Sequence, residues 1–524
     1  MVTISNDSIF ISKDDPSFMT LRSDLTFFNS GVRKIYKKRK DGSTYSISQN
    51  YNDITKIYEN YNNGIIIPRG LLEFIKPYIV NSEIKDNQIK SKFFNVNFTK
   101  DDIENCKNIL NSGFDLRPEQ IIAIRKIMLC KRCIIQSATG SGKTEIMSGF
   151  LKMMNFKFGE YPTSLIVEPT VTLVNGTIKR LEKYRIPVSN YRELRDIEIG
   201  KANVCHPKSL INDLNKNPQL LSKINIIIGD EVHHMRSILF RSPSLNSSNI
   251  DYSVGLSASA ISLEHIGKKF LTEYNCDELN ILGSCGPLVM NLKSGDLIDK
   301  GNLAKPVVIA LDNPADEPIP DNEIANWHRI SKDCLQSDNR VNLVCESAKF
   351  FSDNNRKIMI LVNTIEWSRK LLTKFKDIDP EFCINNVRAS YGGERYEYID
   401  RFGNFIDDNS DVLKDYSNNK YSVLIGTSHI YEGADVPNLD VLILAFGGKR
   451  ERIVQQGIGR VLRKTKNGKF AYVIDFTDHK NIVLSKQFKI RAKMYKEIMN
   501  VPDELFYKNV KLKDLPIIFK ELEE

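Results

Sequence analysis

The sequence predicts an α/β protein in which two parallel-sheet domains follow one another along the chain. Short apolar segments, separated by stretches of helix length, occur in two sets, and such segments are typical of parallel strands buried on both faces. A length of 524 residues accommodates roughly three to four domains of ~150 residues. Hydrophobic residues make up 41% and charged residues 27% of the chain, which indicates a folded rather than a disordered protein.

The apolar segments define the expected strands. The first set comprises residues 133–136, 164–167, 225–228 and 252–256, and the second comprises residues 357–362, 422–425, 441–445 and 470–474. Between the sets, the stretch Leu311–Pro320 contains three prolines and reads as part of a connection. The expected organisation is an N-terminal α+β accessory module at 1–110, a first parallel-sheet domain at 111–310, a connecting segment at 311–340, a second parallel-sheet domain at 341–478 and a helical C-terminal extension at 479–524.

Composition argues against a membrane or secreted protein. No uninterrupted apolar run of about 18 residues is present, so we expect no membrane span. The segment Met1–Asp15 lacks the basic stretch and apolar core of a secretory signal peptide. The nine cysteines are scattered and odd in number, as expected for reduced thiols in a cytoplasmic protein.

The net charge of +9 is unevenly distributed. Residues 440–524 contain 18 basic and 11 acidic residues and so carry +7 of the total. A second basic cluster near the N-terminus has no intervening acid and consists of Arg33, Lys34, Lys37, Lys38, Arg39 and Lys40. Such clusters permit an anionic partner, but a solvated basic surface is an equally physical interpretation.

A glycine-rich loop between an expected strand and an expected helix predicts a nucleoside triphosphate site. Gly140 and Gly142 allow consecutive backbone N–H groups to face an anion at the helix N-terminus. Lys143 can reach the β- and γ-phosphates, and the Thr144 hydroxyl can bind Mg²⁺. Ser137 stands where the usual pattern has its first glycine. The residues expected to bind the triphosphate are Thr139, Gly140, Ser141, Gly142, Lys143 and Thr144.

Two adjacent carboxylates form the second part of the expected site. The apolar run 226–228 should deliver Asp230 and Glu231 to the carboxyl end of a strand, where open α/β sheets bind ligands. Asp230 is suited to Mg²⁺, which retains several waters and takes one or two carboxylates. Glu231 is then placed to orient or deprotonate the attacking water. The sequence thus predicts a Mg²⁺ site at Thr144 and Asp230.

Further motifs, over most of residues 114–463, resemble those of superfamily 2 helicases of the DExH type. Their first-domain motifs match Phe114–Gln120, Val167–Thr170, Asp230–His233 and Gly255–Ser259. This resemblance implies that Arg117 and Gln120 contact the adenine of ATP. It also implies that Pro169 and Thr170 contact the nucleic-acid backbone and that Gly255–Ser259 links the ATP and nucleic-acid sites.

The second domain carries the remaining motifs in the same order, namely Ile360–Thr364, Ile425–Thr427, Glu432–Pro437 and Gln456–Arg463. The resemblance implies nucleic-acid contacts at Asn363 and Thr427. Gly433 and Asp435 would belong to the motif that couples strand contact to the nucleotide. The fold implied for both domains is that of RecA-like phosphate-loop NTPase lobes.

The final motif has a direct physical interpretation. Gln456, Arg460 and Arg463 follow a spacing of 0, 4 and 7, so a helix would present all three on one face. Two guanidiniums directed at the γ-phosphate would neutralise the charge that develops during phosphoryl transfer, an effect of about 10³ to 10⁵ in rate. A solvated basic helix face is the alternative.

Within the superfamily, the chain resembles the phage UvsW-like and XPB-like DNA helicases. The resemblance rests on Ile66–Leu71, Gly286–Leu288 and Leu297–Pro306. It implies an ATP-dependent monomer that uses Mg²⁺ to unwind duplex DNA or to migrate forks and junctions, with residues 1–110 as a DNA-recognition module. Roles in recombination, repair and replication, in the cytoplasm of a bacterium or a phage-infected cell, would follow. An RNA helicase, the motor subunit of a restriction or remodelling complex, and an ATP-gated DNA clamp remain alternatives.

Several other residues have simpler interpretations. Cys130 and Cys133 have no second pair at zinc-ligand spacing and are expected to be free thiols. Trp327 and Trp367 are expected in a core or between lobes. His233 is expected to couple the carboxylates to Ser257 or Gln456. The basic segment 488–496 is expected to form an amphipathic helix with apolar residues on the second lobe and lysines outward.

Overall fold

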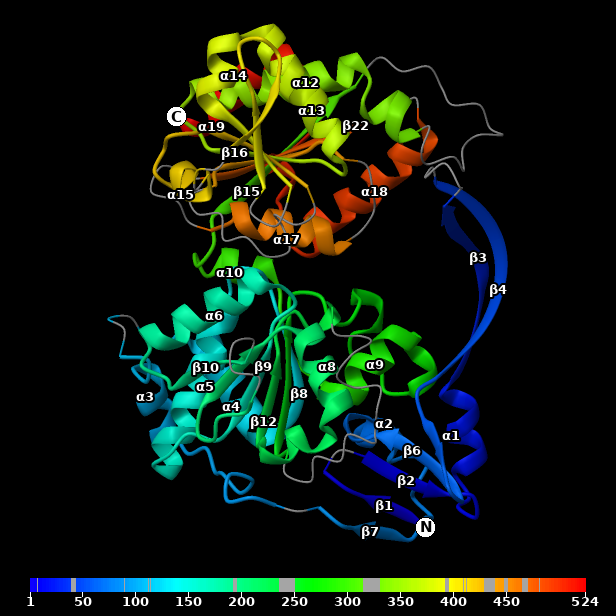
Figure 1. Cartoon of the computed structure of the whole chain (residues 1–524). Helices are drawn as coiled ribbons and strands as arrows, with labels where there is room; N and C mark the ends of the chain where they lie inside the picture. Colours follow the sequence, from blue (N-terminus) through cyan, green and yellow to red (C-terminus); the bar gives the residue numbers. More distant parts are fainter. Residues whose placement is uncertain are drawn as a thin grey trace. The chain divides into compact units, whose positions relative to one another are not determined.

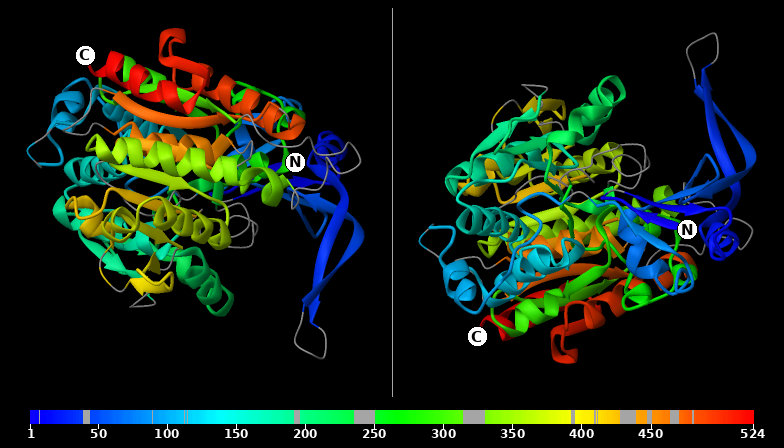
Figure 2. Two further views of the ribbon diagram at one scale, coloured as in Figure 1. Left: turned by 90° about the horizontal axis from the view of Figure 1, so that it is seen from above. Right: turned by 90° about the horizontal axis from the view of Figure 1, so that it is seen from below.

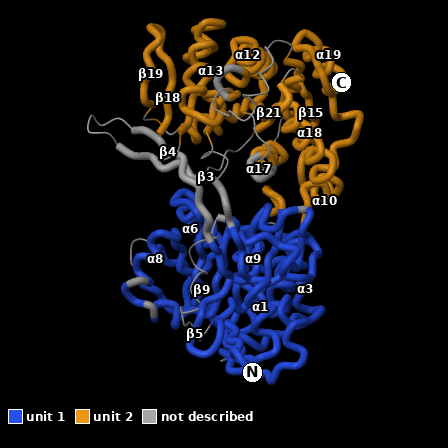
Figure 3. Tube along the Cα trace, turned by 90° about the vertical axis from the view of Figure 1, so that its right-hand side faces the viewer, with its two compact units in different colours: residues 1–137, 142–291 blue, residues 138–141, 292–524 orange. Residues whose placement is uncertain are grey.

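The computed structural model describes the chain as two compact units (Figure 3). The first unit comprises residues 1–137 and 142–291, and the second comprises residues 138–141 and 292–524. The described residues are all of 1–524 except 7, 39–43, 89, 112, 114, 192–195, 235–249, 314–329, 392–394, 409, 411, 428–438, 447–450, 464–469 and 480. Each unit is built on one large, mainly parallel sheet with helices (Figure 1), which confirms the predicted fold class.

The large sheet of the first unit has seven strands in the order β10-β11-β9-β12-β13-β8-β14. Its strands are β8 (Arg132–Ser137), β9 (Ser164–Val167), β10 (Val188–Asn190), β11 (Ala202–Cys205), β12 (Ile226–Gly229), β13 (Tyr252–Ser257) and β14 (Leu288–Leu292). The five recorded pairings from β10 to β8 are all parallel. All four expected strands of this domain are therefore confirmed, and β10, β11 and β14 are additional.

Helices cover both faces of this sheet, which explains why its strands are apolar without alternation. Ile226 and Ile228 pack in one cluster with α4 and α5, whereas Ile227 between them packs in another cluster with α8. Likewise, Leu165 packs in the cluster with α8 and Ile166 in the cluster with α4 and α5. The helices are α4 (Pro118–Cys130), α5 (Lys143–Phe158), α6 (Val171–Lys183), α8 (Pro207–Lys216) and α9 (Cys276–Cys285).

The N-terminal module is α+β, as expected, and packs directly on the first parallel-sheet domain. It has a five-stranded sheet in the order β5-β6-β2-β1-β7 and a separate two-stranded sheet, β3-β4. Its elements are β1 (Val2–Ile4), β2 (Ser8–Ser12), α1 (Phe18–Asp24), β3 (Thr26–Lys38), β4 (Thr44–Lys56), β5 (Glu59–Tyr61), β6 (Gly64–Pro68), α2 (Leu72–Ile75), β7 (Ile84–Asp86) and α3 (Asp101–Lys107).

At Gly70 the backbone of the module packs closely against α9. A Cβ built on Gly70 would lie 2.2 Å from the carbonyl oxygen of Leu282 in α9, so no larger residue fits without a shift. One continuous hydrophobic cluster joins Ile65 and Leu71 of the module to Ile134 of β8. The module and the first parallel-sheet domain are therefore packed as one body within the first unit.

The sheet of the second unit has nine strands in the order β19-β18-β17-β20-β16-β21-β22-β15-β23. The strands are β15 (Lys305–Asp312), β16 (Ile358–Leu361), β17 (Val387–Ser390), β18 (Tyr396–Ile399), β19 (Phe405–Asp408), β20 (Val423–Gly426), β21 (Val441–Leu444), β22 (Phe470–Thr477) and β23 (Phe506–Val510). The helices are α10 (Ser294–Asp299), α12 (Asp338–Asp353), α13 (Ile365–Ile378), α14 (Pro380–Asn386), α15 (Val412–Ser417), α17 (Glu451–Val461), α18 (Ile482–Glu497) and α19 (Leu515–Glu523). The four expected strands here are β16, β20, β21 and β22.

Two boundaries differ from those expected. The first domain was expected to reach residue 310, but the units divide at residues 291 and 292, and β15 pairs in parallel with β22 of the second unit. The prolines that suggested a connection follow β15 rather than precede it. The C-terminal extension contains the expected helices, α18 and α19, and also β23, which pairs with β15 at the edge of the sheet. Residues 305–312 and 506–510 thus complete the second sheet from outside the expected domain.

The helix α18 packs as expected, with one exception. Phe488 is buried against the second unit, and the lysines of α18 at positions 489, 493 and 496 are exposed. Arg491, however, is only 2% exposed. Its guanidinium donates two hydrogen bonds, of 2.9 and 2.8 Å, to the carboxylate of Asp475 in β22. Tyr495 donates a third, of 2.6 Å, to the same carboxylate. A buried ion pair therefore attaches the C-terminal helix to the sheet.

We predict that Arg491→Met lowers the free energy of unfolding of the second unit by about 3 to 5 kcal/mol, because it leaves the carboxylate of Asp475 buried without its counter-charge. Differential scanning calorimetry of the full chain measures the change. The exposed Lys489→Met on the same helix is the matched control and should unfold like the wild type. A wild-type transition in Arg491→Met would contradict the prediction, whereas the double variant Asp475→Asn/Arg491→Met should recover part of the loss.

Candidate functional site

The loop after β8 has the backbone that the sequence predicts for a phosphate site. Gly140 and Gly142 have φ angles of 83° and 84°, in the left-handed region that favours glycine. Gly142 is the N-cap of α5, so Lys143 and Thr144 form its first turn. A Cβ built on Gly142 would lie 2.2 Å from Nε2 of Gln120, so a side chain at this position would displace the Gln120 amide. The expected strand–loop–helix arrangement is present.

Arg117 and Gln120 lie beside this loop. They form the start of α4, where the Gln120 Oε1 accepts the backbone N–H of Arg117 at 2.9 Å. A Cβ on Gly142 would lie 3.3 Å from an Arg117 guanidinium nitrogen. The two residues expected to contact adenine are therefore adjacent to the loop expected to bind phosphate. Phe114, at the start of the same motif, lies outside the described residues.

The centre of the site is an ion pair between Lys143 and Glu231. Lys143 Nζ lies 2.7 Å from Glu231 Oε1, and the two side chains are only 11% and 13% exposed. Burial alone would lower the pKa of Lys143, but the carboxylates of Glu231 and Asp230 outweigh burial and raise it. The lysine is thus held in its charged form by its carboxylate neighbours.

Asp230 and Glu231 follow β12, as predicted. The Glu231 backbone N–H donates to Asp230 Oδ1 at 2.9 Å, and Glu231 has a φ of 43°, which is uncommon for a residue with a Cβ. Burial raises the pKa of Asp230 to about 6; the charge of Lys143 opposes this shift and that of Glu231 adds to it. A bound cation would favour the ionised carboxylate in the same place.

The donor set fits Mg²⁺. Asp230 supplies a carboxylate and Thr144 a hydroxyl at the start of α5, and Mg²⁺ prefers one or two such oxygen ligands together with phosphate and water. Thr139 Oγ1, in the preceding loop, is buried and has no hydrogen-bond partner among the described residues. No group of three or more His, Cys, Asp or Glu side chains forms an all-protein metal cage in the described part of the chain. Cys130 and Cys133 belong to no such group among the described residues, and both are free thiols.

His233 and Ser257 connect Glu231 to the end of β13. His233 Nδ1 lies 2.7 Å from the Ser257 hydroxyl oxygen, as the sequence suggested. Ser257 donates to Glu231 Oε2 at 3.3 Å and accepts the backbone N–H of Ser259 at 3.1 Å. Glu231 and the Gly255–Ser259 segment therefore share one hydrogen-bond network.

Sequence reasoning missed Glu168. This carboxyl, at the end of β9, is fully buried and accepts the Thr177 hydroxyl at 2.6 Å, while its Oε2 has no hydrogen-bond partner among the described residues. Burial raises the pKa of Glu168 well above its usual value, and the nearby charge of Asp230 adds to the shift. An acid directly before Pro169 in an otherwise apolar strand end was the available signal.

The expected nucleic-acid contacts lie at strand ends in the two units. Thr170 is the N-cap of α6, where its hydroxyl accepts the backbone N–H of Leu173 at 3.2 Å, and Pro169 precedes it; both are partly exposed. In the second unit, Asn363 follows β16 and is exposed, whereas Thr427 follows β20 and is only 6% exposed. Thr427 thus offers little surface to a strand in this conformation.

The arginine motif lies on and just beyond α17. Arg460 is 8% exposed on the helix, but the helix ends at Val461, so Arg463 does not continue the helical face that its spacing suggested. Within the second unit, a Cβ built on Gly140 would lie 3.8 Å from Arg463 Cγ, and one built on Gly459 would lie 2.4 Å from Thr139 Cβ. Gly433, Asp435 and the side chain of Gln456 lie outside the described part of the chain.

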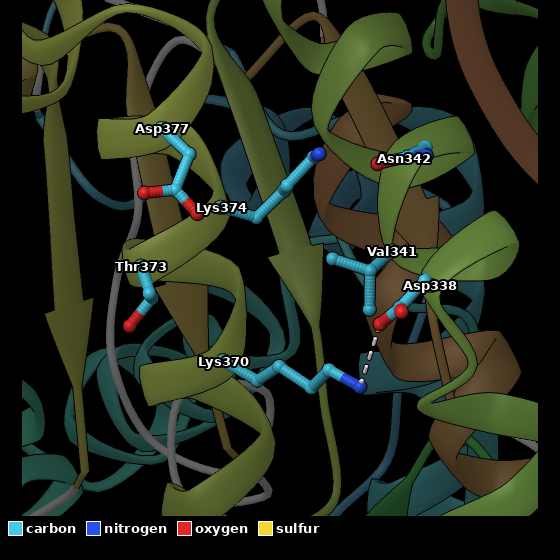
Figure 4. Close-up of a pocket in the computed structure, with 7 residues that line it drawn as sticks. All are labelled: Asp338, Val341, Asn342, Lys370, Thr373, Lys374 and Asp377. Atoms are coloured by element: carbon cyan, nitrogen blue, oxygen red, sulfur yellow. Dashed lines mark ion pairs between the residues drawn. The ribbon is translucent and has the colours of Figure 1, made fainter.

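A surface cavity of about 520 Å³ lies elsewhere in the second unit, between α12 and α13 (Figure 4). Its lining residues are Asp338, Val341, Asn342, Lys370, Thr373, Lys374 and Asp377. Lys370 forms an ion pair of 3.2 Å with Asp338 across it. None of the predicted site residues lines this cavity. Trp367, on α13, is fully buried, as expected of a core residue; Trp327 lies outside the described residues.

Comparison with known families agrees with this geometry. Residues 113–261 match the family described as "Type III restriction enzyme, res subunit", and residues 339–465 match the "Helicase conserved C-terminal domain". Together the two matches cover more than half of the 524 residues.

Similar proteins share most of the chain. "Putative helicase 22" of Sulfolobus islandicus filamentous virus is 23% identical over 459 residues, which cover 81% of this chain and 73% of that protein. The "DNA 3'-5' translocase XPB2" of Sulfurisphaera tokodaii is 22% identical over 427 residues, which cover 70% of this chain and 84% of that protein. Among solved structures, "the fragment structure of a putative HsdR subunit of a type I restriction enzyme" from Vibrio vulnificus has a TM-score of 0.53 at 14% identity, covering 77% of this chain and 70% of that one.

The two matched domains and the phosphate-loop site define an ATP-dependent helicase, an enzyme that uses ATP and binds nucleic acid. The chain belongs to the superfamily 2 helicases and is similar to the XPB group among them, as its motifs predicted. No helix in the described part of the chain combines the length and apolar character needed to cross a membrane.

We predict that Glu231→Gln retains nucleotide binding but lowers ATP turnover by about 10²- to 10⁴-fold, the usual contribution of a general base. Loss of the carboxylate removes both the base and the partner of Lys143, so the lysine stays available to phosphate. Phosphate release measures turnover, and fluorescence of a labelled ATP analogue measures binding.

The control is Glu264→Gln, which removes a carboxylate that is 78% exposed in the same unit. It should behave as the wild type in both assays. Wild-type turnover in Glu231→Gln would remove Glu231 from the chemical step.

Proposed function

We propose that the protein is an ATP-dependent DNA helicase or translocase that unwinds duplexes or migrates forked and junction DNA. The Lys143–Glu231 ion pair is the observation that carries the proposal, because it joins the two groups that phosphoryl transfer to water requires. The choice of DNA is supported by the similarity to a DNA translocase of the XPB group.

In the proposed mechanism, ATP binding changes the ion-pair partner of Lys143 from Glu231 to phosphate. The ammonium group of Lys143 then pairs with the β- and γ-phosphates instead of with Glu231. The backbone N–H groups of residues 140–142 surround the phosphates. The released Glu231 carboxylate then accepts a hydrogen bond from the attacking water and takes its proton. ATP binding itself would therefore switch the base from a paired to an active state.

Asp230 and Thr144 would hold Mg²⁺, which when bound neutralises charge on the phosphate oxygens. Arg117 and Gln120 would contact the base, because they lie against the same loop. Gln456, Arg460 and Arg463 would stabilise the transferring phosphoryl group, and Gly433 and Asp435 would respond to the nucleotide. These assignments rest on the helicase motifs of the chain.

Coupling to the strand would use the network around Ser257. A change at Glu231 reaches the Gly255–Ser259 segment through one hydroxyl, because Ser257 contacts both Glu231 and His233. Pro169, Thr170, Asn363 and Thr427 would contact phosphates of the strand, so that binding is independent of sequence and weakens steeply with salt. Thr427 would need to become more exposed for this role.

We further propose a monomer that acts in the cytoplasm of a bacterium or a virus-infected cell, in recombination, repair or replication. A viral helicase relative and the absence of disulfides among the described cysteines support this setting. Residues 1–110, 111–291, 292–478 and 479–524 would then serve as accessory module, two motor lobes and C-terminal extension.

We predict that DNA containing a fork or a four-way junction stimulates ATP hydrolysis more than RNA of matched sequence and form does. The preference is measured as stimulation of ATPase activity by forks, junctions and flush duplexes made of DNA and of RNA. Strand displacement is then measured on the same substrates, with Lys143→Ala as the inactive control. Greater stimulation by RNA would favour the RNA helicase alternative. ATPase activity that no nucleic acid changes would overturn the motor proposal, and stimulation without displacement would indicate a clamp or a translocating subunit.

A further inference from the structure

The helix α6 begins at a proposed strand contact and packs beside the helix of the phosphate loop. Its N-cap is Thr170, which the proposed function places on the phosphates of a strand. Leu181 of α6 and Phe150 of α5 belong to one hydrophobic cluster, so the two helices cover the same face of the first sheet (Figures 1 and 2). A helix of 13 residues is about 20 Å long. A displacement of one end of α6 would therefore reach a site about 20 Å away.

Polar side chains on one side of α6 turn toward the protein interior. Thr177, Arg180 and the C-cap residue Tyr184 follow a spacing of three and four residues, which places them along one side of the helix. Thr177 and Tyr184 are buried, whereas Lys179 and Lys183 on the other side are exposed. Buried polar groups need hydrogen-bond partners, and the partners of these side chains lie near the nucleotide site.

The carboxylate of Glu145 is the partner of two of them. Arg180 Nη1 donates to Glu145 Oε1 at 3.1 Å, and the Tyr184 hydroxyl donates to the same oxygen at 3.0 Å. Glu145 is the third residue of α5 and directly follows Lys143 and Thr144. Its carboxylate thus attaches α6 to the first turn of the phosphate-loop helix.

The second oxygen of Glu145 lies against the phosphate loop. A Cβ built on Gly142 would lie 3.0 Å from Glu145 Oε2, 2.2 Å from Gln120 Nε2 and 3.3 Å from an Arg117 guanidinium nitrogen. Glu145 therefore shares the space beside Gly142 with both residues that would contact the base. A nucleotide that moves the loop, Arg117 or Gln120 would change the surroundings of a carboxylate whose first oxygen is held by α6.

A second carboxyl holds α6 at another point. Thr177 donates to Glu168 at 2.6 Å. Glu168 and Asp230 directly follow Val167 and Gly229, which pair in the neighbouring strands β9 and β12. The helix is thus attached both to the phosphate-loop helix and to a strand end next to the one that carries the proposed Mg²⁺ ligand.

We propose that Glu145, Arg180 and Tyr184 are positioning residues that couple nucleotide binding to strand binding through α6. This inference rests on the proposed function, because it takes Thr170 as a strand contact. Coupling is reciprocal, so ATP and the strand would each change the affinity for the other by the same factor, typically about 5- to 150-fold. Without the attachment, both sites would persist but would bind their ligands independently.

The test removes the donors to Glu145 and leaves its carboxylate in place. Arg180→Met/Tyr184→Phe removes both hydrogen bonds while the side chains keep a similar size. Tyr184→Phe alone removes one hydrogen bond and no charge. Lys183→Met is the matched control, because it removes the same charge as Arg180→Met from the same last turn of α6, but at an exposed position.

Fluorescence anisotropy of a labelled single strand of DNA, titrated with the full chain, measures binding with and without Mg²⁺ and the non-hydrolysable ATP analogue AMP-PNP. The ratio of the two affinities is the coupling factor. We expect a factor of about 5 to 150 for the wild type and for Lys183→Met, a factor near one for the double variant and an intermediate factor for Tyr184→Phe. Strand affinity without nucleotide, AMP-PNP affinity without DNA and basal ATP turnover should stay close to wild-type values in the double variant.

A wild-type coupling factor in the double variant would overturn the inference, as would an equal loss in Lys183→Met. A merely structural role would lower the melting temperature or weaken one of the separate affinities and leave the coupling factor unchanged, which would also overturn it. If the double variant does not fold, a wild-type coupling factor in Tyr184→Phe has the same meaning.

Failure of the proposed function gives a different result. If the wild type binds no DNA strand and its ATPase activity responds to no nucleic acid, the motor proposal fails. If nucleic acid stimulates the ATPase activity but AMP-PNP leaves strand affinity unchanged in the wild type, the inference on α6 fails and the proposed function stands.

Discussion

The site depends on the register of the parallel strands in the first unit. Val167 pairs with Gly229, Gly229 pairs with Gly255, and Ser257 pairs with Gln136. The segments that follow β8, β9, β12 and β13 therefore leave the sheet at the same edge. Burial of both faces maintains this register, since a slip by one residue would exchange the side chains of every strand between two different cores. Lys143 and Glu231, 88 positions apart, form an ion pair only because the strands end together.

Much of the fold could be predicted from the sequence because parallel strands buried on both faces are continuous apolar runs. All eight expected strands are present, within a few residues of the predicted bounds. Two of the missed strands lack that signal. β10 has only three residues, two of them polar, and β19 contains two aspartates. The assignment of β15 to the second sheet depends on its pairing with β22, more than 150 residues later, and no local pattern reports such a pairing.

The candidate site likewise has features that sequence motifs predict and features that only the folded structure shows. The motifs predict Lys143, Asp230 and Glu231 as site residues, because phosphate and metal chemistry restrict the residue types at each position. They did not indicate that Glu231 occupies a left-handed backbone conformation, or that Glu168 is a buried carboxyl whose pKa is affected by the charge of Asp230. Both features depend on tertiary packing. Arg463 illustrates the opposite error, since its spacing suggested a helix that ends two residues earlier.

The strand β23 has a consequence for how the protein is made. It covers one edge of β15, and it consists of residues 506–510, which are synthesised long after residues 305–312 of β15. Until then the growing chain carries a strand of eight residues whose edge is open and whose centre is wholly apolar, which is the kind of template that recruits other chains. β23 would therefore protect the edge of β15 once it is synthesised, and a nascent chain that has β15 but not yet β23 would be the form most prone to aggregate.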